Sequence, residues 1–251
     1  MTAHPCPRAC CPCPSPVPAG RAVPLRWRPA PERITRARIT ALTRWLARRR
    51  GLHFDAATEY EALRRWSVTD LKGFWSAAWQ FFDMRASLPP PRLLCDPRMP
   101  GARWGEDARL NLVDQVFRHV EEAAAAGRPA FIARNEGGTQ AELGWRGLQA
   151  QAGALAASLR WLGLQRGNRA VACLPNVPQA IVAFLAEAGV GGTWSICSPD
   201  MGPVAVLDRV RQIEPRMLIA CDGDRYGGKA FDRSAVISPS GARRCPRSRT
   251  R

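Results

Sequence analysis

The sequence predicts an α/β protein: a mainly helical N-terminal region, followed by an incomplete parallel β-sheet layered with helices. Two observations predict this fold. From residue 130 to residue 221, short apolar runs alternate with helical patterns, which is typical of a parallel sheet covered on both faces. From residue 31 to residue 126, apolar side chains recur at helical spacing. The expected divisions are a helical region over residues 24–128 and a partial α/β domain over residues 129–233.

Three helices are expected in the helical region, over residues 31–50, 71–82 and 111–126. Gly51 and Gly127 follow the first and the third helix, where glycine commonly ends a helix. Residues 67–70, Ser-Val-Thr-Asp, indicate a capping box that opens the second helix, whose aromatic stripe favours a packed face over a ligand platform. His119 lies on the third helix without a second metal-ligating side chain at a suitable spacing, so it is predicted to be a surface histidine.

Strands and helices alternate in the α/β region. The strands are expected over residues 131–134, 141–144, 169–174, 192–197 and 217–221, and the helices over residues 145–161, 179–188 and 204–213. Residues 136–139 are expected to form the turn between the first two strands. Side chains on buried strands or inward helix faces are predicted to form the core: Leu155, Leu159, Val171, Cys173, Ile181, Phe184, Leu185, Leu207, Leu218 and Ile219.

The net charge of +16 is confined to the two ends of the chain. Residues 1–51 hold eleven arginines and one acid, and residues 229–251 hold seven basic side chains and one acid, so residues 52–228 are neutral overall. A specific nucleic-acid-binding surface should draw its charge from the folded part, which disfavours that class of function. The sequence has no run of about 18–20 apolar residues, so a membrane span is not expected either. The arginine-rich face of the first helix favours a solvated surface over a membrane-bound one.

The two ends are expected to be disordered tails, over residues 1–23 and 234–251, because proline and arginine replace any apolar pattern there. Cys10 and Cys13 form a C-x-x-C pair, but Pro12 lies inside it and no second Cys/His pair follows at zinc-binding spacing. No metal site is therefore assigned. The cysteines outside the N-terminal tail are scattered singly, which indicates reduced core residues of a cytoplasmic protein.

Eight short motifs occur in an order that is shared with a known enzyme family. They are Arg65–Val68, Phe74-Trp75, Arg103–Asn111, Leu174–Asn176, Trp194–Asp200, Asp208-Arg209, Gln212–Pro215 and Tyr226–Lys229. Together they resemble the N-terminal part of the acetoacetyl-CoA synthetases, members of the acyl-adenylate-forming (AMP-binding) superfamily, over residues 24–233. Two short stretches depart from the family pattern, at residues 105–107 and 167–169, without interrupting the order of the motifs.

The resemblance implies an activity and its cofactors. Enzymes of this family join an acid to ATP as an acyl-adenylate, release pyrophosphate, and pass the acyl group to CoA. ATP, Mg²⁺ and CoA are thus the implied cofactors, and acetoacetate, ATP and CoA are the implied small-molecule partners. The family's Ser/Thr/Gly-rich loop, whose backbone N–H groups cradle the ATP phosphates, is not found in these 251 residues. No catalytic residue and no metal ligand is assigned.

One stretch is expected to contact a ligand directly. In the related acetyl-CoA synthetases, a Gly-Gly segment flanked by basic residues contacts the CoA nucleotide, and by position the matching residues here are Tyr226, Gly227, Gly228 and Lys229. Glycines admit a close backbone approach, and a cation attracts a phosphate. An ordinary surface turn is the alternative interpretation.

Three functions are compatible with the sequence. The first is an AMP-forming acetoacetate–CoA ligase, of which this chain is expected to be an N-terminal fragment that is inactive alone. The second is a catalytically inactive truncated or frame-shifted remnant, or an interaction module. The third, disfavoured by the position of the charge, is a basic nucleic-acid-binding protein.

Overall fold

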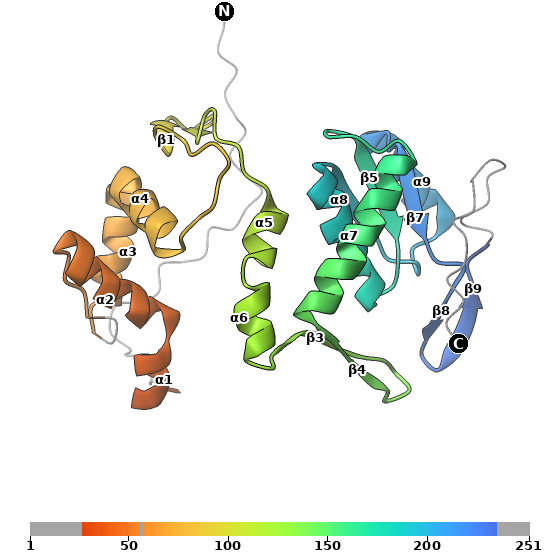
Figure 1. Cartoon of the computed structure of the whole chain (residues 1–251), viewed down its shortest axis with the longest axis horizontal. Coiled ribbons are helices and arrows are strands. Elements are labelled where there is room, and N and C mark those ends of the chain that lie inside the picture. Colours follow the sequence, from red (N-terminus) through yellow and green to blue (C-terminus); the bar gives the residue numbers. More distant parts are fainter. Residues whose placement is uncertain (1–26, 56–57, 235–251) are drawn as a thin grey trace, which may run out of the picture. The chain divides into compact units, whose positions relative to one another are not determined.

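The computed structural model describes residues 27–55 and 58–234, which divide into two compact units with a boundary between Asp70 and Leu71 (Figure 1). The expected tails lie outside the described residues, except for residue 234. Among the described residues, no helix has both the length and the apolar character that crossing a bilayer requires. Each unit is described by itself below.

The described residues of the first unit form three helices, α1 (Pro31–Arg36), α2 (Arg38–Arg50) and α3 (Tyr60–Thr69). A single helix was expected over residues 31–50, and the structure interrupts it at Ala37, whose backbone is extended (φ −66°, ψ 143°). The Thr40 hydroxyl donates a hydrogen bond of 2.6 Å to the carbonyl of Ile34, across this interruption. Gly51, in the left-handed region at φ 65°, ends α2 as predicted.

The predicted capping box at residues 67–70 is wrong. Residues 67–69 belong to the last turn of α3, and the next helix, α4 (Leu71–Phe81), begins after them. The hydroxyls of Ser67 and Thr69 donate backwards, to the carbonyls three and four residues earlier, at 2.7 and 2.9 Å. A serine or threonine hydroxyl between two helices can either cap the following helix or donate to a carbonyl of the preceding turn. Both hydroxyls do the latter here.

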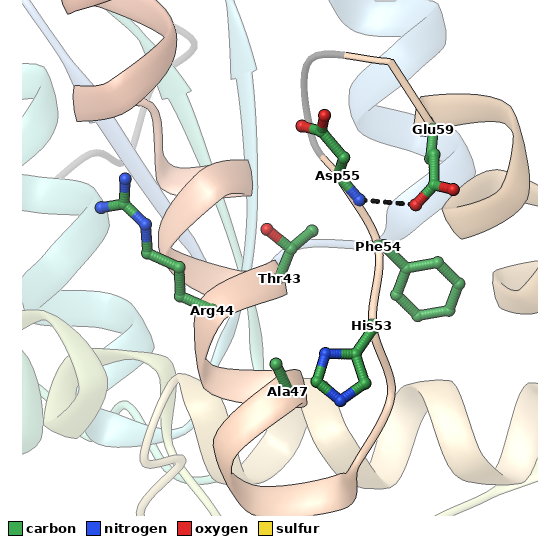
Figure 2. A pocket seen from close by; sticks show the side chains of 7 residues that line it. All are labelled: Thr43, Arg44, Ala47, His53, Phe54, Asp55 and Glu59. Carbon is green, nitrogen blue, oxygen red and sulfur yellow. Dashed lines mark hydrogen bonds between the residues drawn. The ribbon is translucent and has the colours of Figure 1, made fainter.

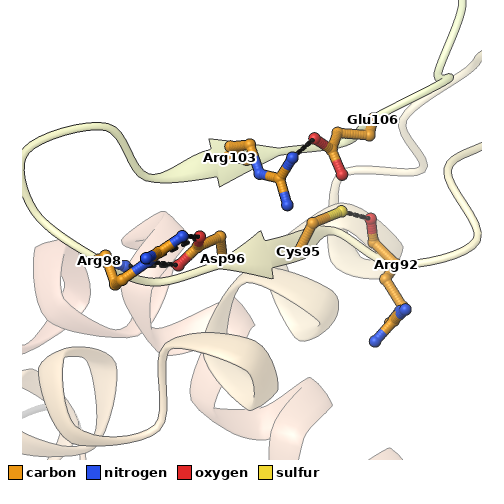
Figure 3. Close-up of polar contacts among 6 residues, drawn as sticks. All are labelled: Arg92, Cys95, Asp96, Arg98, Arg103 and Glu106. Carbon is orange, nitrogen blue, oxygen red and sulfur yellow. Dashed lines mark hydrogen bonds and ion pairs between the residues drawn. The ribbon is translucent and has the colours of Figure 1, made fainter.

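The second unit begins with α4 and a short antiparallel pair, β1 (Leu94–Asp96) and β2 (Arg103–Trp104). Ion pairs flank the two strands (Figure 3): Arg98, in the connection between them, pairs with Asp96 at 2.6 Å, and Arg103 of β2 pairs at 3.1 Å with Glu106, which follows β2. The indole of Trp104 meets that of Trp75 edge to face, with 5.7 Å between ring centroids. The aromatic stripe of α4 therefore packs in part on this strand pair, although Trp75 itself is exposed.

The helix expected over residues 111–126 is divided into α5 (Leu112–Phe117) and α6 (Val120–Ala125). Arg118, at the division, donates from its guanidinium to the carbonyls of residues 82 and 83, which ties the break to the end of α4. Asn111 caps α5 by accepting from the N–H of Val113 at 2.8 Å. His119 stands at the start of α6 and is exposed, which confirms the prediction of a surface histidine.

The α/β region follows the predicted alternation closely. A hairpin of β3 (Pro129–Arg134) and β4 (Gln140–Gly144) leads into α7 (Trp145–Trp161). The elements that follow are β5 (Arg169–Cys173), α8 (Pro178–Val190), β6 (Thr193–Cys197), α9 (Pro203–Ile213), β7 (Met217–Ala220), β8 (Gly223–Tyr226) and β9 (Lys229–Asp232). The parallel sheet has the order β6-β5-β7. Because β6 and β7 flank β5 on opposite sides, right-handed crossovers place α8 and α9 on opposite faces.

The core lies around β5 and beneath α7 and α8 (Figure 1). The strand residues 170–172 are at most 1% exposed. Of the predicted core, Leu159, Val171, Cys173 and Leu185 are buried, and Leu155, Phe184 and Ile219 are partly buried.

Three predicted core residues are exposed instead: Ile181 by 40%, Leu207 by 45% and Leu218 by 44%. Ile181 lies on α8, where Val182 and Leu185 take the inward positions. Leu218 lies on β7, an edge strand of the described sheet, and Leu207 on α9, which makes few contacts with that sheet. The periodicity predicts which face of an element is apolar, but not whether another element covers it.

This exposed apolar surface leads us to expect self-association of the purified chain. Leu207→Glu should shift its elution in size-exclusion chromatography toward the monomer position, because a carboxylate resists burial between two copies. Ala205→Glu is the matched control, since Ala205 is also exposed on α9 but contributes little apolar area. Monomeric elution of the unmodified chain at micromolar concentration would contradict this expectation.

Candidate anion-binding turn

The four predicted ligand-contacting residues form the tip of one hairpin. β8 and β9 pair antiparallel in the register Tyr226↔Lys229, and Gly227 and Gly228 make a two-residue turn. Both glycines are in the left-handed region, at φ 59° and 75°. Tight hairpin turns of this kind require positive φ at both central positions, which glycine adopts without strain. The structure therefore brings together all four residues that the sequence singled out.

The hairpin follows the carboxyl end of β7, the edge of an open α/β sheet at which ligands commonly bind. Its base is anchored by Asp224 and Arg233, whose side chains pair at 2.6 Å and are only 5% and 20% exposed. The Arg233 guanidinium also lies over the Phe231 ring, 5.0 Å from its centroid. The hydrogen bond from Arg233 to Asp224 raises the pKa of Arg233 above its usual value. This anchor joins the two strands of the hairpin at its base.

Both turn N–H groups already hold an anion. The N–H groups of Gly227 and Gly228 donate to Oε1 and Oε2 of Glu136, each at 3.0 Å. Glu136 lies in the turn between β3 and β4. Its pKa is held below the usual value, chiefly by the N–H of Gly228, then by that of Gly227, with a smaller contribution from the charge of Arg225. Two adjacent N–H groups with a nearby cation make an anion-binding concavity.

Sequence reasoning missed Glu136 and the Asp224–Arg233 anchor. The Glu136 contact joins residues that are 91 and 92 positions apart, and no periodicity in the sequence reports such a contact. The only available signal was chemical: an acid in one predicted turn and two glycines in another.

Lys229 and Tyr226 are exposed at the tip, and Lys229 makes no ion pair with any residue in the described ranges.

Three cysteines gather at the carboxyl end of the parallel sheet: Cys173 ends β5, Cys197 ends β6 and Cys221 follows β7. All three are free thiols. Burial raises the pKa of Cys173 and of Cys221, so both are protonated at neutral pH and unsuited to nucleophilic catalysis. Within residues 27–55 and 58–234, no group of three or more His, Cys, Asp or Glu side chains is placed to hold a metal ion.

Two pockets in the structure are lined by none of the four tip residues. The first, of about 350 Å³, lies in the first unit and is lined by Thr43, Arg44, Ala47, His53, Phe54, Asp55 and Glu59 (Figure 2). Its acids are engaged locally, since Glu59 accepts from the N–H of Asp55 at 2.8 Å and Asp55 accepts from Thr58 at 2.7 Å. The second, of about 280 Å³, lies between α4 and the proline-rich segment at residues 89–91. Neither pocket presents two adjacent N–H donors to one anion, as the hairpin tip does.

Comparison with known proteins assigns the chain to a family. The family model described as "AMP-binding enzyme" matches residues 117–247, and the model described as "Acetyl-coenzyme A synthetase N-terminus" matches residues 60–116. The acetoacetyl-coenzyme A synthetase of Rhizobium meliloti (strain 1021) is 35% identical over 206 residues, which are 82% of this chain and 30% of that protein. The malonamoyl-CoA synthetase vrtB of Penicillium aethiopicum is 31% identical over 173 residues, 68% of this chain and 24% of that protein.

A solved structure agrees with these matches. The acetoacetyl-CoA synthetase from Streptomyces lividans superposes with a TM-score of 0.77 and 44% sequence identity, over 84% of this chain and 32% of that one. The chain thus spans about a third or less of the length of the relatives it matches. Since the AMP-binding model covers more than half of its residues, the chain belongs to the AMP-binding enzyme family, in which it is similar to the N-terminal portion of the acetoacetyl-CoA synthetases.

Proposed function

We propose that this chain forms the N-terminal part of a cytoplasmic, AMP-forming acetoacetate–CoA ligase and contributes a contact to the CoA nucleotide. The observation that carries the proposal is the β8–β9 tip, where Gly227 and Gly228 present two N–H groups to an anion beside Lys229. The relatives named for acetoacetate support the acid substrate. Free thiols at the sheet edge support a reducing compartment.

The tip fits a phosphate of CoA because it already binds a carboxylate. The turn N–H groups would donate to phosphate oxygens, and the Lys229 ammonium would add a charge-assisted contact. The Tyr226 ring, 66% exposed, is available to stack on a nucleobase. When bound, CoA supplies the thiol that accepts the acyl group. The ATP phosphates and Mg²⁺ have no comparable cradle in the 251 residues, which contain no Ser/Thr/Gly-rich phosphate loop.

The choice of acid is the least constrained part of the proposal. The malonamoyl-CoA synthetase matches 68% of the chain at 31% identity, and the acetoacetyl-CoA synthetase of Rhizobium meliloti matches 82% of it at 35% identity. The matched portion is therefore common to enzymes named for different short acids. We propose acetoacetate because it is the acid named for the relatives from Rhizobium meliloti and Streptomyces lividans, which are 35% and 44% identical to this chain.

Lys229→Ala should weaken CoA binding to the chain about two- to fivefold, the loss expected of an exposed charge pair. Isothermal titration calorimetry at low ionic strength measures the effect. Lys72→Ala is the matched control, because Lys72 is the other lysine of the chain, is exposed, and lies on α4. If Lys229 contacts the ribose phosphate of CoA, the Lys229→Ala variant should discriminate less between CoA and dephospho-CoA than the unmodified chain does. Equal effects of the two substitutions would contradict the assignment.

A further inference from the structure

The contact between Glu136 and the turn at Gly227-Gly228 joins two hairpin tips that are distant in the sequence. Both carboxylate oxygens are used, one for each N–H group, at 3.0 Å. The contact is on the surface, since Glu136 and both glycines are exposed. A carboxylate that accepts from two N–H groups presents the same two-oxygen edge that a phosphate group presents to such donors.

Neither hairpin needs this contact for its own shape. The turn of the β3–β4 hairpin is closed by Asn135, which accepts from the N–H of Thr139 at 2.9 Å. The β8–β9 hairpin has its own four-residue ladder and the Asp224–Arg233 anchor. Release of Glu136 therefore requires only a side-chain rotation in an exposed turn, on a time scale far shorter than that of unfolding.

We propose that Glu136 is an internal competitor: in the ligand-free chain its carboxylate occupies the N–H pair of Gly227 and Gly228, and a phosphate-bearing ligand must displace it to bind there. The identity of that ligand as CoA rests on the proposed function, whereas the competition itself rests on the two hydrogen bonds. Displacement exchanges a monoanionic carboxylate for a phosphate of higher charge, which the nearby cations Arg225 and Lys229 favour.

The expected size of the effect follows from the fraction of molecules in which the N–H pair is free. If Glu136 occupies the pair in about 70–90% of molecules, the apparent dissociation constant of a phosphate ligand is about three- to tenfold higher than its intrinsic value. Glu136→Gln removes the charge and leaves a single acceptor oxygen. Phosphate ligands should therefore bind this variant about three- to tenfold more tightly.

Titration calorimetry with two probes, inorganic pyrophosphate and CoA, tests the competition. Glu142→Gln is the matched control, because Glu142 is an exposed acid on β4 of the same hairpin and lies outside the contact. Tighter binding of pyrophosphate to the Glu136→Gln variant, with less than a twofold change in the control, supports the proposal. Equal affinities of all three proteins, or weaker binding to Glu136→Gln, overturn it.

Spectra of the unmodified chain separate this proposal from the CoA assignment. In protein labelled with ¹⁵N-glycine and ¹³C-glutamate, pyrophosphate should shift the amide signals of Gly227 and Gly228 while the ¹³C signal of the Glu136 carboxylate moves to its unbound position. If pyrophosphate does so and CoA does not, the competition stands and the CoA assignment falls. If CoA shifts the glycine signals while Glu136 is unchanged, the assignment stands and the competition falls. If neither probe affects these signals, both are wrong.

Discussion

Purified as the 251-residue chain, the protein is expected to release no pyrophosphate above background from ATP, Mg²⁺, acetoacetate and CoA. Catalysis of transfer at phosphorus depends almost entirely on positioning and on neutralisation of charge. The glycine-rich stretch closest to a phosphate loop, residues 137–139, lies in the tight turn between β3 and β4, where Asn135 closes the turn. Loss of one charge-stabilising donor typically costs about 10²–10³ in rate, and here a whole cradle is absent from the sequence.

A coupled pyrophosphate assay on protein of verified intact mass measures this outcome. A full-length acetoacetyl-CoA synthetase, such as the Streptomyces lividans relative, provides the positive control under identical conditions. Binding of CoA to the inactive chain would support the ligase interpretation over that of a remnant without ligand contacts. Acetoacetate-dependent release of pyrophosphate by the chain alone would contradict the prediction and place an active site within these residues.

The α/β region was predicted well because its elements are set by local pattern. The helix over residues 145–161 is found at its predicted bounds, and β5, β6 and β7 differ from the prediction by one residue each. Buried parallel strands are short apolar runs between turn residues, so their positions are visible in a single sequence. The order β6-β5-β7, by contrast, depends on pairing between strands, and the sequence did not indicate it.

The helical region was predicted less well because its helix ends depend on contacts distant in sequence. The break at residues 118–119 coincides with hydrogen bonds from Arg118 to the end of α4, more than thirty residues earlier. The same limit applies to the site. The turn at residues 227–228 was visible as Gly-Gly, whereas its acceptor Glu136 comes from another hairpin. Local propensity indicates turns and strands, but not their partners.

The most strongly perturbed acid of the described core is Glu187, which sequence reasoning placed on a helix without a role. Its side chain is fully buried on α8, and neither carboxylate oxygen has a hydrogen-bond partner among the described residues. Burial raises the pKa of Glu187 from its usual value of 4.5 to about 7. The acid lies against Gly192, where a Cβ would be 2.2 Å from Oε1.

This buried acid should make the stability of the fold depend on pH. Because the folded-state pKa lies above the unfolded one, the folded chain binds more protons between pH 4.5 and 7. The contribution of Glu187 to the free energy of unfolding is therefore greatest below pH 4.5, falls as pH rises to about 7, and is constant above. The difference is about 3 kcal/mol. Glu187→Met, of similar length and uncharged, should remove this dependence and stabilise the chain by about 3 kcal/mol at pH 8.

Gly192→Ala should destabilise the chain by about 1–3 kcal/mol, since the added methyl group meets the Glu187 carboxylate in a packed interior. Urea unfolding followed by tryptophan fluorescence measures each variant. Glu187→Ala removes the obstructing side chain, so Gly192→Ala should cost far less in that background, with a coupling energy of about 1–2 kcal/mol. Gly153→Ala, on the exposed side of α7 with no atom within 4 Å of the new Cβ, is the matched control and should be neutral or stabilising. If Gly192→Ala lowered the free energy of unfolding equally in both backgrounds, glycine would be required at this position by its backbone conformation and not by contact with the Glu187 side chain.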